Sequence, residues 1–117
     1  MIEPYYQDES CTIYNADCLE ILPQLEKVDL VLTDPPYGIT ACDWDVKIDI
    51  WEHIKCRAIM TASQPFTSEI VISNLKNFKH EWIWQKNRGS NFLKAKYGPL
   101  KEHESVLVFG EGIYNPQ

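Results

Sequence analysis

The chain has 117 residues and a mass of 13.6 kDa, which suits one domain and is too short for two ordinary ones. With 44% apolar and 12% aromatic residues it can bury a core, so wholesale disorder is excluded. Its apolar runs are far shorter than the roughly 20 residues of a membrane span, and its N-terminus lacks the basic-then-apolar pattern of a signal peptide. We therefore expect a single cytoplasmic domain without a membrane partner.

The net charge of −6 hides an uneven distribution along the chain. Residues 1–75 carry 4 basic and 13 acidic side chains, residues 76–101 carry 7 and 1, and residues 102–117 carry 0 and 3. A basic block inside an acidic chain is typical either of a solvated surface or of a local contact with phosphate groups. Both interpretations stay open at this level.

The cysteines and histidines do not form a metal-binding pattern. The four cysteines lie at positions 11, 18, 42 and 56, so there is no pair at CxxC spacing, and the three histidines are equally scattered. The pattern favours free thiols over zinc ligands, and we expect no metal site.

The first half of the chain alternates between strand and helix character. Residues 11–15 are β-branched and aromatic, and residues 18–25 have apolar side chains at helical spacing. Residues 28–33 are a short apolar run ended by two prolines, which is typical of a strand covered on both faces. After a loop rich in Asp and Gly, residues 48–54 are weakly helical.

The second half continues the alternation. Residues 57–62 read as a buried strand, and residues 66–75 have apolar side chains on one helical face. Strands are again predicted at residues 80–85 and 104–109, separated by the polar segment 86–103. This order predicts an α/β layered domain with a largely parallel sheet.

The run Asp-Pro-Pro-Tyr-Gly at positions 34–38 follows a predicted buried strand directly. In an open α/β sheet, ligands gather at the carboxyl ends of the strands, so a reactive group is expected here. A simple turn would explain the prolines and the glycine but neither the carboxylate nor the aromatic ring. A ligand for a WW-type module would need the order Pro-Pro-x-Tyr, which is absent.

Residues 34–37 resemble the catalytic motif of the amino-methylating DNA methyltransferases that use S-adenosylmethionine, in particular the adenine-N6 type often found in phage and restriction–modification systems. Segments 38–45, 63–68, 81–109 and 114–117 are similar to the same family in the same order, so the resemblance covers nearly the whole chain. It implies an α/β fold that is part of a Rossmann-like methyltransferase sheet, mostly parallel with a last antiparallel strand. It also implies a site-specific enzyme that acts on double-stranded DNA.

The chemistry of amine methylation explains the residue types of the motif. The lone pair of an exocyclic amine is delocalised into the base, so the nitrogen needs two acceptors that draw its hydrogens out of plane. The Asp34 carboxylate and the Pro35 carbonyl can accept one N–H each and offset the developing positive charge. Pro36 helps to fix the backbone direction, and Tyr37 offers a face on which an extruded base stacks. These four residues are the predicted catalytic set.

The resemblance also implies a set of cofactor-binding residues. Asp17 resembles the acidic residue that meets the adenine ring of S-adenosylmethionine, although it can equally be the N-cap of the helix that follows it. Asp34 would face the methyl donor. Gln64, Pro65 and Phe66 are implied to line the cofactor pocket, and the alternative for them is an ordinary helix start.

The basic segment is the predicted DNA-binding region. Cations there alternate with aromatic and amide side chains, which suits phosphate contact and base stacking. The residues that we assign to DNA are Lys86, Arg88, Asn91, Lys94 and Lys96.

One family feature is missing. Members carry a Phe-x-Gly-x-Gly loop for the methionine part of the cofactor, whereas residues 109–112 have their glycines at the wrong spacing. The chain therefore resembles a truncated methylase domain, the N-terminal, catalytic half. The resemblance places two further strands beside residues 28–33, whose edge would be bare without them. We expect a complementing C-terminal half or a homo-oligomer as partner, with cytosine-N4 methylation or a non-catalytic remnant or split subunit as alternatives.

Overall fold

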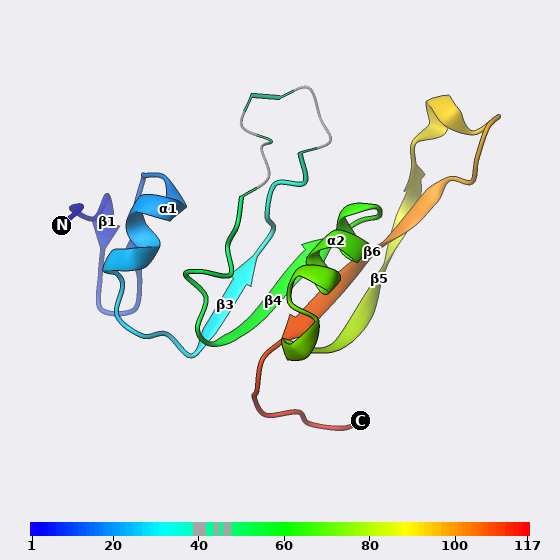
Figure 1. Ribbon diagram of the computed structural model, residues 1–117. Coiled ribbons are helices and arrows are strands. Elements are labelled where there is room, and N and C mark those ends of the chain that lie inside the picture. Colours follow the sequence, from blue (N-terminus) through cyan, green and yellow to red (C-terminus); the bar gives the residue numbers. More distant parts are fainter. Residues whose placement is uncertain (39–41, 44, 46–47) are drawn as a thin grey trace.

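A computed structural model describes residues 1–38, 42, 43, 45 and 48–117 (Figure 1). Its elements in chain order are β1 (Tyr6–Gln7), β2 (Thr12–Ile13), α1 (Cys18–Ile21), η1 (Leu22–Gln24), β3 (Leu30–Thr33), β4 (Arg57–Ala62), α2 (Phe66–Ser73), η2 (Leu75–Asn77), β5 (Phe78–Ser90), η3 (Phe92–Lys94) and β6 (Lys101–Phe109). Among these described residues no helix has the length and apolarity to cross a membrane.

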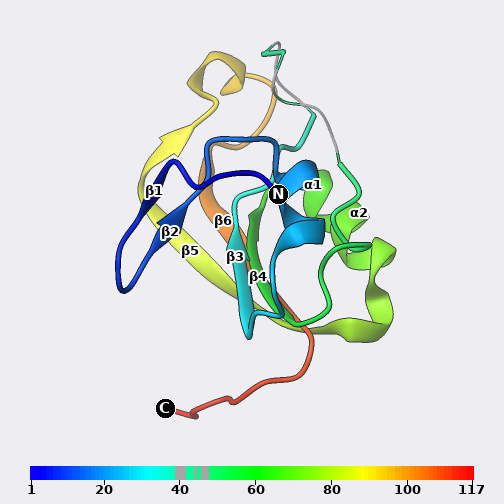
Figure 2. The same ribbon diagram turned by 90° about the vertical axis from the view of Figure 1, so that its left-hand side faces the viewer.

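The first two strands form a small hairpin of their own. β1 pairs with β2 in antiparallel register, and neither joins the main sheet. The strand expected at residues 11–15 is therefore present but short. The helix expected at residues 18–25 is confirmed as α1 continued by the 3₁₀ turn η1. Hairpin and helix lie beyond the β3 edge of the main sheet (Figures 1 and 2).

The main sheet has the strand order β3-β4-β6-β5. Only β3 and β4 run parallel, whereas β6 is antiparallel to both β4 and β5. The expected mostly parallel, Rossmann-like methyltransferase sheet is therefore wrong. The structure is a mixed, mostly antiparallel four-stranded sheet with few helices and a separate two-stranded hairpin.

Two local features produce this difference. Residues 51–53 form a turn where a weak helix was expected, so no described helix covers the sheet between β3 and β4. The segment 86–103, expected as a long connection, is instead strand at both ends, because β5 runs on to Ser90 and β6 begins at Lys101. β5 and β6 are thus consecutive arms of a hairpin, which makes them antiparallel.

Helix α2 covers one face of the sheet and organises the core. The expected helix at residues 66–75 is confirmed as α2 followed by η2. Alternate residues of β4 and β6 point toward it and are fully or nearly fully buried. The core consists of Ile50, Ala58, Met60, Ala62, Phe66, Ile70, Leu107 and Phe109.

Strand β3 differs from the expectation of a strand covered on both faces. It pairs with β4 on one side only, and within the described residues no strand pairs with its other edge. Leu30 is 46% exposed and Leu32 is 74% exposed, while Val31 packs against the core. β3 is therefore an edge strand with one uncovered face.

We predict that stability depends on the α2 side of the sheet. Leu107 is completely buried there, so Leu107→Ala should lower the free energy of unfolding by about 2–5 kcal/mol through lost burial and a cavity. Leu93, which is 82% exposed, supplies the matched control, and Leu93→Ala should change stability by less than about 0.5 kcal/mol. Urea unfolding followed by circular dichroism measures both, and equal effects would show that this core is not what holds the fold.

Candidate functional site

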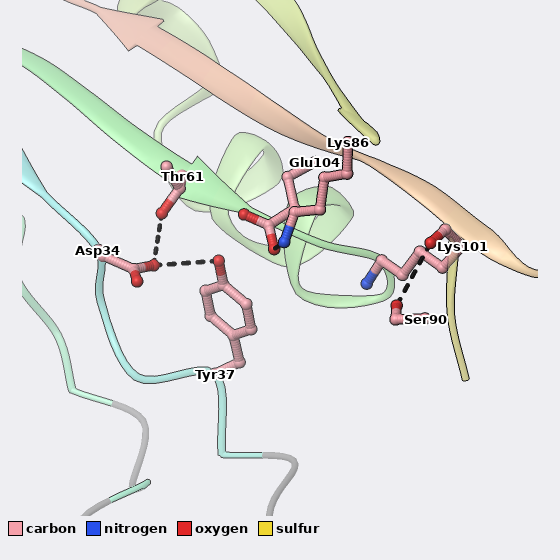
Figure 3. Close-up of polar contacts among 7 residues, drawn as sticks. All are labelled: Asp34, Tyr37, Thr61, Lys86, Ser90, Lys101 and Glu104. Carbon is pink, nitrogen blue, oxygen red and sulfur yellow. Dashed lines mark hydrogen bonds and ion pairs between the residues drawn. The ribbon is translucent and has the colours of Figure 1, made fainter. Parts of the chain in front are cut away.

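The carboxylate of Asp34 lies where β3 ends beside the last residues of β4. The two strands are parallel with Thr33 opposite Met60, so the next residue of β3's chain is brought beside Thr61. The hydroxyl of Thr61 donates a hydrogen bond to Oδ1 of Asp34 (Figure 3). The motif is thus anchored to a neighbouring strand by a residue that sequence reasoning missed. The only signal for Thr61 was its place at the carboxyl end of a predicted strand.

Tyr37 turns back toward the same carboxylate. Its hydroxyl donates to Oδ1 of Asp34 at 3.3 Å, a long hydrogen bond, and its ring stacks on Phe66 with the ring centroids 4.8 Å apart and the planes 22° apart. Both hydrogen bonds use Oδ1. Within the described residues, Oδ2 of Asp34 has no hydrogen-bond partner. Asp34 is an exposed residue, so within the described part of the chain this second oxygen is an acceptor beside a positioned aromatic ring.

The two prolines form a rigid link between Asp34 and Tyr37. Pro35 is buried and Pro36 is half-buried. The Pro35 carbonyl accepts no backbone hydrogen bond from the described residues. The turn ends at Gly38, whose φ of 70° favours glycine and whose N–H donates to Oδ1 of the buried Asp45 at 2.8 Å. Residues 39–41 and 44 of the similar segment 38–45 lie outside the described residues.

The phenol of Tyr37 sits in an environment that disfavours its ionised form. Burial, together with the negative charges of Asp34 and Glu104, raises the pKa of Tyr37 to about 12, and a hydrogen bond with Thr61 opposes the shift. The hydroxyl therefore remains a neutral donor at physiological pH.

Glu104 of β6 and Lys86 of β5 form the polar border of the site (Figure 3). The Nζ atom of Lys86 and the Oε1 atom of Glu104 are 2.5 Å apart. The Lys86 ammonium also lies 5.0 Å from the ring centroid of Trp84. Lys86 was predicted to bind DNA, but here it pairs with a carboxylate. Glu104 was not predicted as a site residue. Sequence offers no signal for this pair, because it forms across the β5–β6 hairpin.

The remaining predicted DNA-binding residues follow the β5–β6 hairpin away from the sheet. Arg88 lies near the end of β5, Asn91 precedes η3 with a φ of 69°, and Lys94 lies in η3. Lys96 follows in the turn, and all four residues are exposed. The hairpin thus forms a basic arm that projects beyond the end of the sheet (Figure 1).

The predicted cofactor-binding residues are not brought together. Asp17 accepts a hydrogen bond from the Leu19 N–H at 2.8 Å as the N-cap of α1, the alternative stated for it. The Gln64 side chain accepts from the Ser68 hydroxyl at 2.8 Å, and Phe66 is 7% exposed within the core. Pro65 is the N-cap residue of α2.

These contacts test whether S-adenosylmethionine fits. No hydrogen bond or ring contact among the described residues links Asp17 to Asp34 or to Gln64. In the described structure Asp17 and Gln64 make local hydrogen bonds, and Phe66 lies in the core.

Within the described residues, no group of three or more His, Cys, Asp or Glu side chains could hold a metal ion. Comparisons with protein-family models and with curated proteins find no match. The interpretation of the site consequently depends on its own residues and geometry.

We predict a pH effect at Tyr37. Below about pH 10 the phenol is protonated in both the folded and the unfolded chain, so it adds no pH dependence. Between about pH 10 and its folded pKa of about 12, the unfolded chain ionises first, and stability falls. Tyr37→Phe should remove this part of the loss in urea unfolding, whereas Tyr97→Phe, at a residue 89% exposed, should keep the wild-type slope. Identical slopes in all three chains would contradict the raised pKa.

Proposed function

We propose that this chain supplies the amine-binding, catalytic half of a site-specific DNA methyltransferase that acts on the exocyclic N6 amine of a flipped adenine, with S-adenosylmethionine as the methyl donor. The observation that carries the proposal is the Asp34 carboxylate, which is held by Thr61 and Tyr37 through one oxygen and has no hydrogen-bond partner among the described residues at the other. The proposal does not depend on the expected fold class, which the structure corrects. It places the protein with DNA in the cytoplasm.

The open oxygen suits the activation of an amine. Thr61 and Tyr37 fix the direction of the carboxylate, so Oδ2 would accept one N–H of the base without a rearrangement of the side chain. The Pro35 carbonyl, which accepts no backbone bond from the described part of the chain, would take the second N–H. Two acceptors turn the nitrogen lone pair out of the ring plane and stabilise the positive charge that develops on nitrogen.

The stacked pair Tyr37 and Phe66 suits a flipped base. Phe66 supports one face of the Tyr37 ring from helix α2, and we assign the opposite face to the base. Aromatic stacking is a common way to hold a base outside the duplex. Because the phenol stays neutral, it donates to Asp34 without adding a second negative charge to the site.

The methyl donor is not accounted for by these residues. S-adenosylmethionine would supply an electrophilic methyl group, but the side chains predicted to bind it make local hydrogen bonds or lie in the core. We therefore infer that the active form includes a complementing polypeptide. The local contacts of the predicted cofactor-binding side chains also favour a second candidate function, in which the chain is a non-catalytic remnant or split subunit. Cytosine-N4 remains the alternative target because its amine needs the same two acceptors.

We predict that Asp34 is essential for methylation. Asp34→Ala removes the acceptor and should lower the methylation rate by on the order of 10² or more, while Asp34→Ser should keep part of the activity. Asp29→Ala, at an exposed carboxylate before β3, is the control and should stay near wild type. The measurement is mass spectrometry of N6-methyladenine and N4-methylcytosine in DNA from native host cells that overproduce each variant. Equal methylation with Asp34→Ala, or none with the wild type, would overturn the proposal.

We predict that the basic arm contacts DNA. Lys94→Glu with Lys96→Glu should weaken duplex binding and reduce its dependence on salt concentration, because fewer counterions are released. Lys27→Glu with Lys55→Glu makes the same charge change outside the arm and should have a smaller effect. Fluorescence anisotropy with a labelled duplex at two ionic strengths separates the two cases. If both double variants bind equally, the arm is only a solvated hairpin.

A further inference from the structure

The sheet has a second face, opposite α2, that carries a set of neighbouring apolar side chains, with the polar Thr61 and Glu104 of the candidate site at one end. In the strand registers Leu32 lies opposite Ile59, Ile59 opposite Val108, and Val106 opposite Trp82. Trp84 is two residues beyond Trp82 on β5 and therefore points to the same side. We call this surface the open face, and it consists of Leu32, Ile59, Val106, Trp82 and Trp84.

The open face is not covered by the described chain. Leu32, Trp82 and Trp84 are 74%, 45% and 52% exposed, and α2 lies on the other side of the sheet (Figure 2). Within the described residues, the C-terminal segment contacts this face at Tyr114, whose ring centroid lies 6.3 Å from that of Trp82. An exposed apolar surface of this kind marks an interaction site. The parallel pairing of β3 with β4 also indicates a missing cover, because parallel strands are normally covered on both faces.

The total exposed surface gives the scale of the missing cover. The chain exposes 9404 Å², whereas a folded monomer of its mass exposes about 6,600 Å². Its radius of gyration is 16.5 Å, compared with about 13 Å for a compact domain of this length. Two copies that each buried the whole excess of roughly 2,800 Å² would bury roughly 5,600 Å² in total, which is about the upper end of the range for obligate homodimers. The projecting hairpin and arm account for part of the excess, so an interface on the open face needs only a fraction of it to reach the size of a stable dimer.

A nucleic acid fits the open face less well. Two cations beside the tryptophans are already paired, Lys86 with Glu104 and Lys79 with Glu111. Phosphate groups would have to compete with both carboxylates for these cations. The apolar side chains of β3 and β4 would stack no base. The open face therefore suits a polypeptide.

The distribution of charge indicates which polypeptide it is. Residues 1–34, which end at β3 and lie along that edge of the sheet, carry eight acidic and one basic side chain. Residues 76–101, which form β5 and the arm on the opposite edge, carry one acidic and seven basic side chains. Two of these seven cations, Lys79 and Lys86, form ion pairs with Glu111 and Glu104, so the other five supply the net positive charge of this edge. One sheet edge is thus strongly negative and the other is moderately positive.

We propose that the open face is a self-association surface on which a second copy of this chain packs face to face. A two-fold axis parallel to the strands would place β3 of one copy opposite β5 of the other, so each acidic edge would meet a basic edge. The apolar side chains of the two open faces would form the centre of the interface. The Thr61 end of the open face borders the candidate site, yet the interface itself does not depend on the proposed function.

Sedimentation equilibrium of the full chain, without DNA or cofactor, tests the proposal. We expect a species of twice the 13.6 kDa chain mass at micromolar concentration. Trp82→Asp and Trp84→Asp should each weaken association by about 100-fold or more, because a buried charge replaces an apolar anchor. Trp84→Phe should keep it. Ile83→Asp is the matched control, since Ile83 is 59% exposed on the same strand but points to the opposite side of the sheet.

The dependence of association on salt concentration is a second measurement in the same experiment. If opposite edges meet, raising the salt from about 0.05 M to 0.5 M should weaken association by about tenfold or more. A chain that stays monomeric well above micromolar concentration would overturn the proposal. So would a dimer that Ile83→Asp disrupts as strongly as Trp84→Asp, or one that strengthens with salt. A monomer that binds single-stranded DNA through Trp84 would assign the open face to nucleic acid instead.

Discussion

The parallel pairing of β3 with β4 is the constraint on which the candidate site depends. Its register places Thr33 opposite Met60 and so brings the residue after β3 to the end of β4. Thr61 then reaches the Asp34 carboxylate, and the rigid prolines return Tyr37 to the same oxygen. A shift by one residue would point Thr61 to the other face and break this arrangement.

The two faces of the sheet have opposite roles. One face packs on α2 and contains the core, with Met60 and Leu107 fully buried. The other carries tryptophans and aliphatic side chains that no described helix covers. Stability and the support of Tyr37 by Phe66 come from the first face, while the second supplies the surface for a partner. The candidate site lies at the end of the sheet where both faces meet.

Charge follows the same spatial division. The acidic N-terminal part lies along β3, and the basic arm extends from β5 at the other edge (Figure 1). An arm on the outermost strand can reach a ligand that approaches the end of the sheet, and the separation of charge lets unlike edges attract. Lys86, where the arm joins the sheet, is held by Glu104 and so links the arm to the border of the site.

The sequence by itself determined the local features. Helix α2, strand β4, the cap at Asp17 and the turn at residues 34–38 follow from short-range patterns of apolar spacing, capping and proline geometry. The family resemblance already implied an antiparallel last strand and a bare edge beside residues 28–33, and the described sheet agrees with both. Tertiary structure alone decided that β5 and β6 form a hairpin, which leaves one parallel pair in the sheet, and which residues contact Asp34 and Lys86. The reason is that a strand's sequence encodes which faces are apolar but not which strand lies beside it. β3 shows this directly: its apolar run predicts two covered faces, and the sheet order leaves one of them exposed.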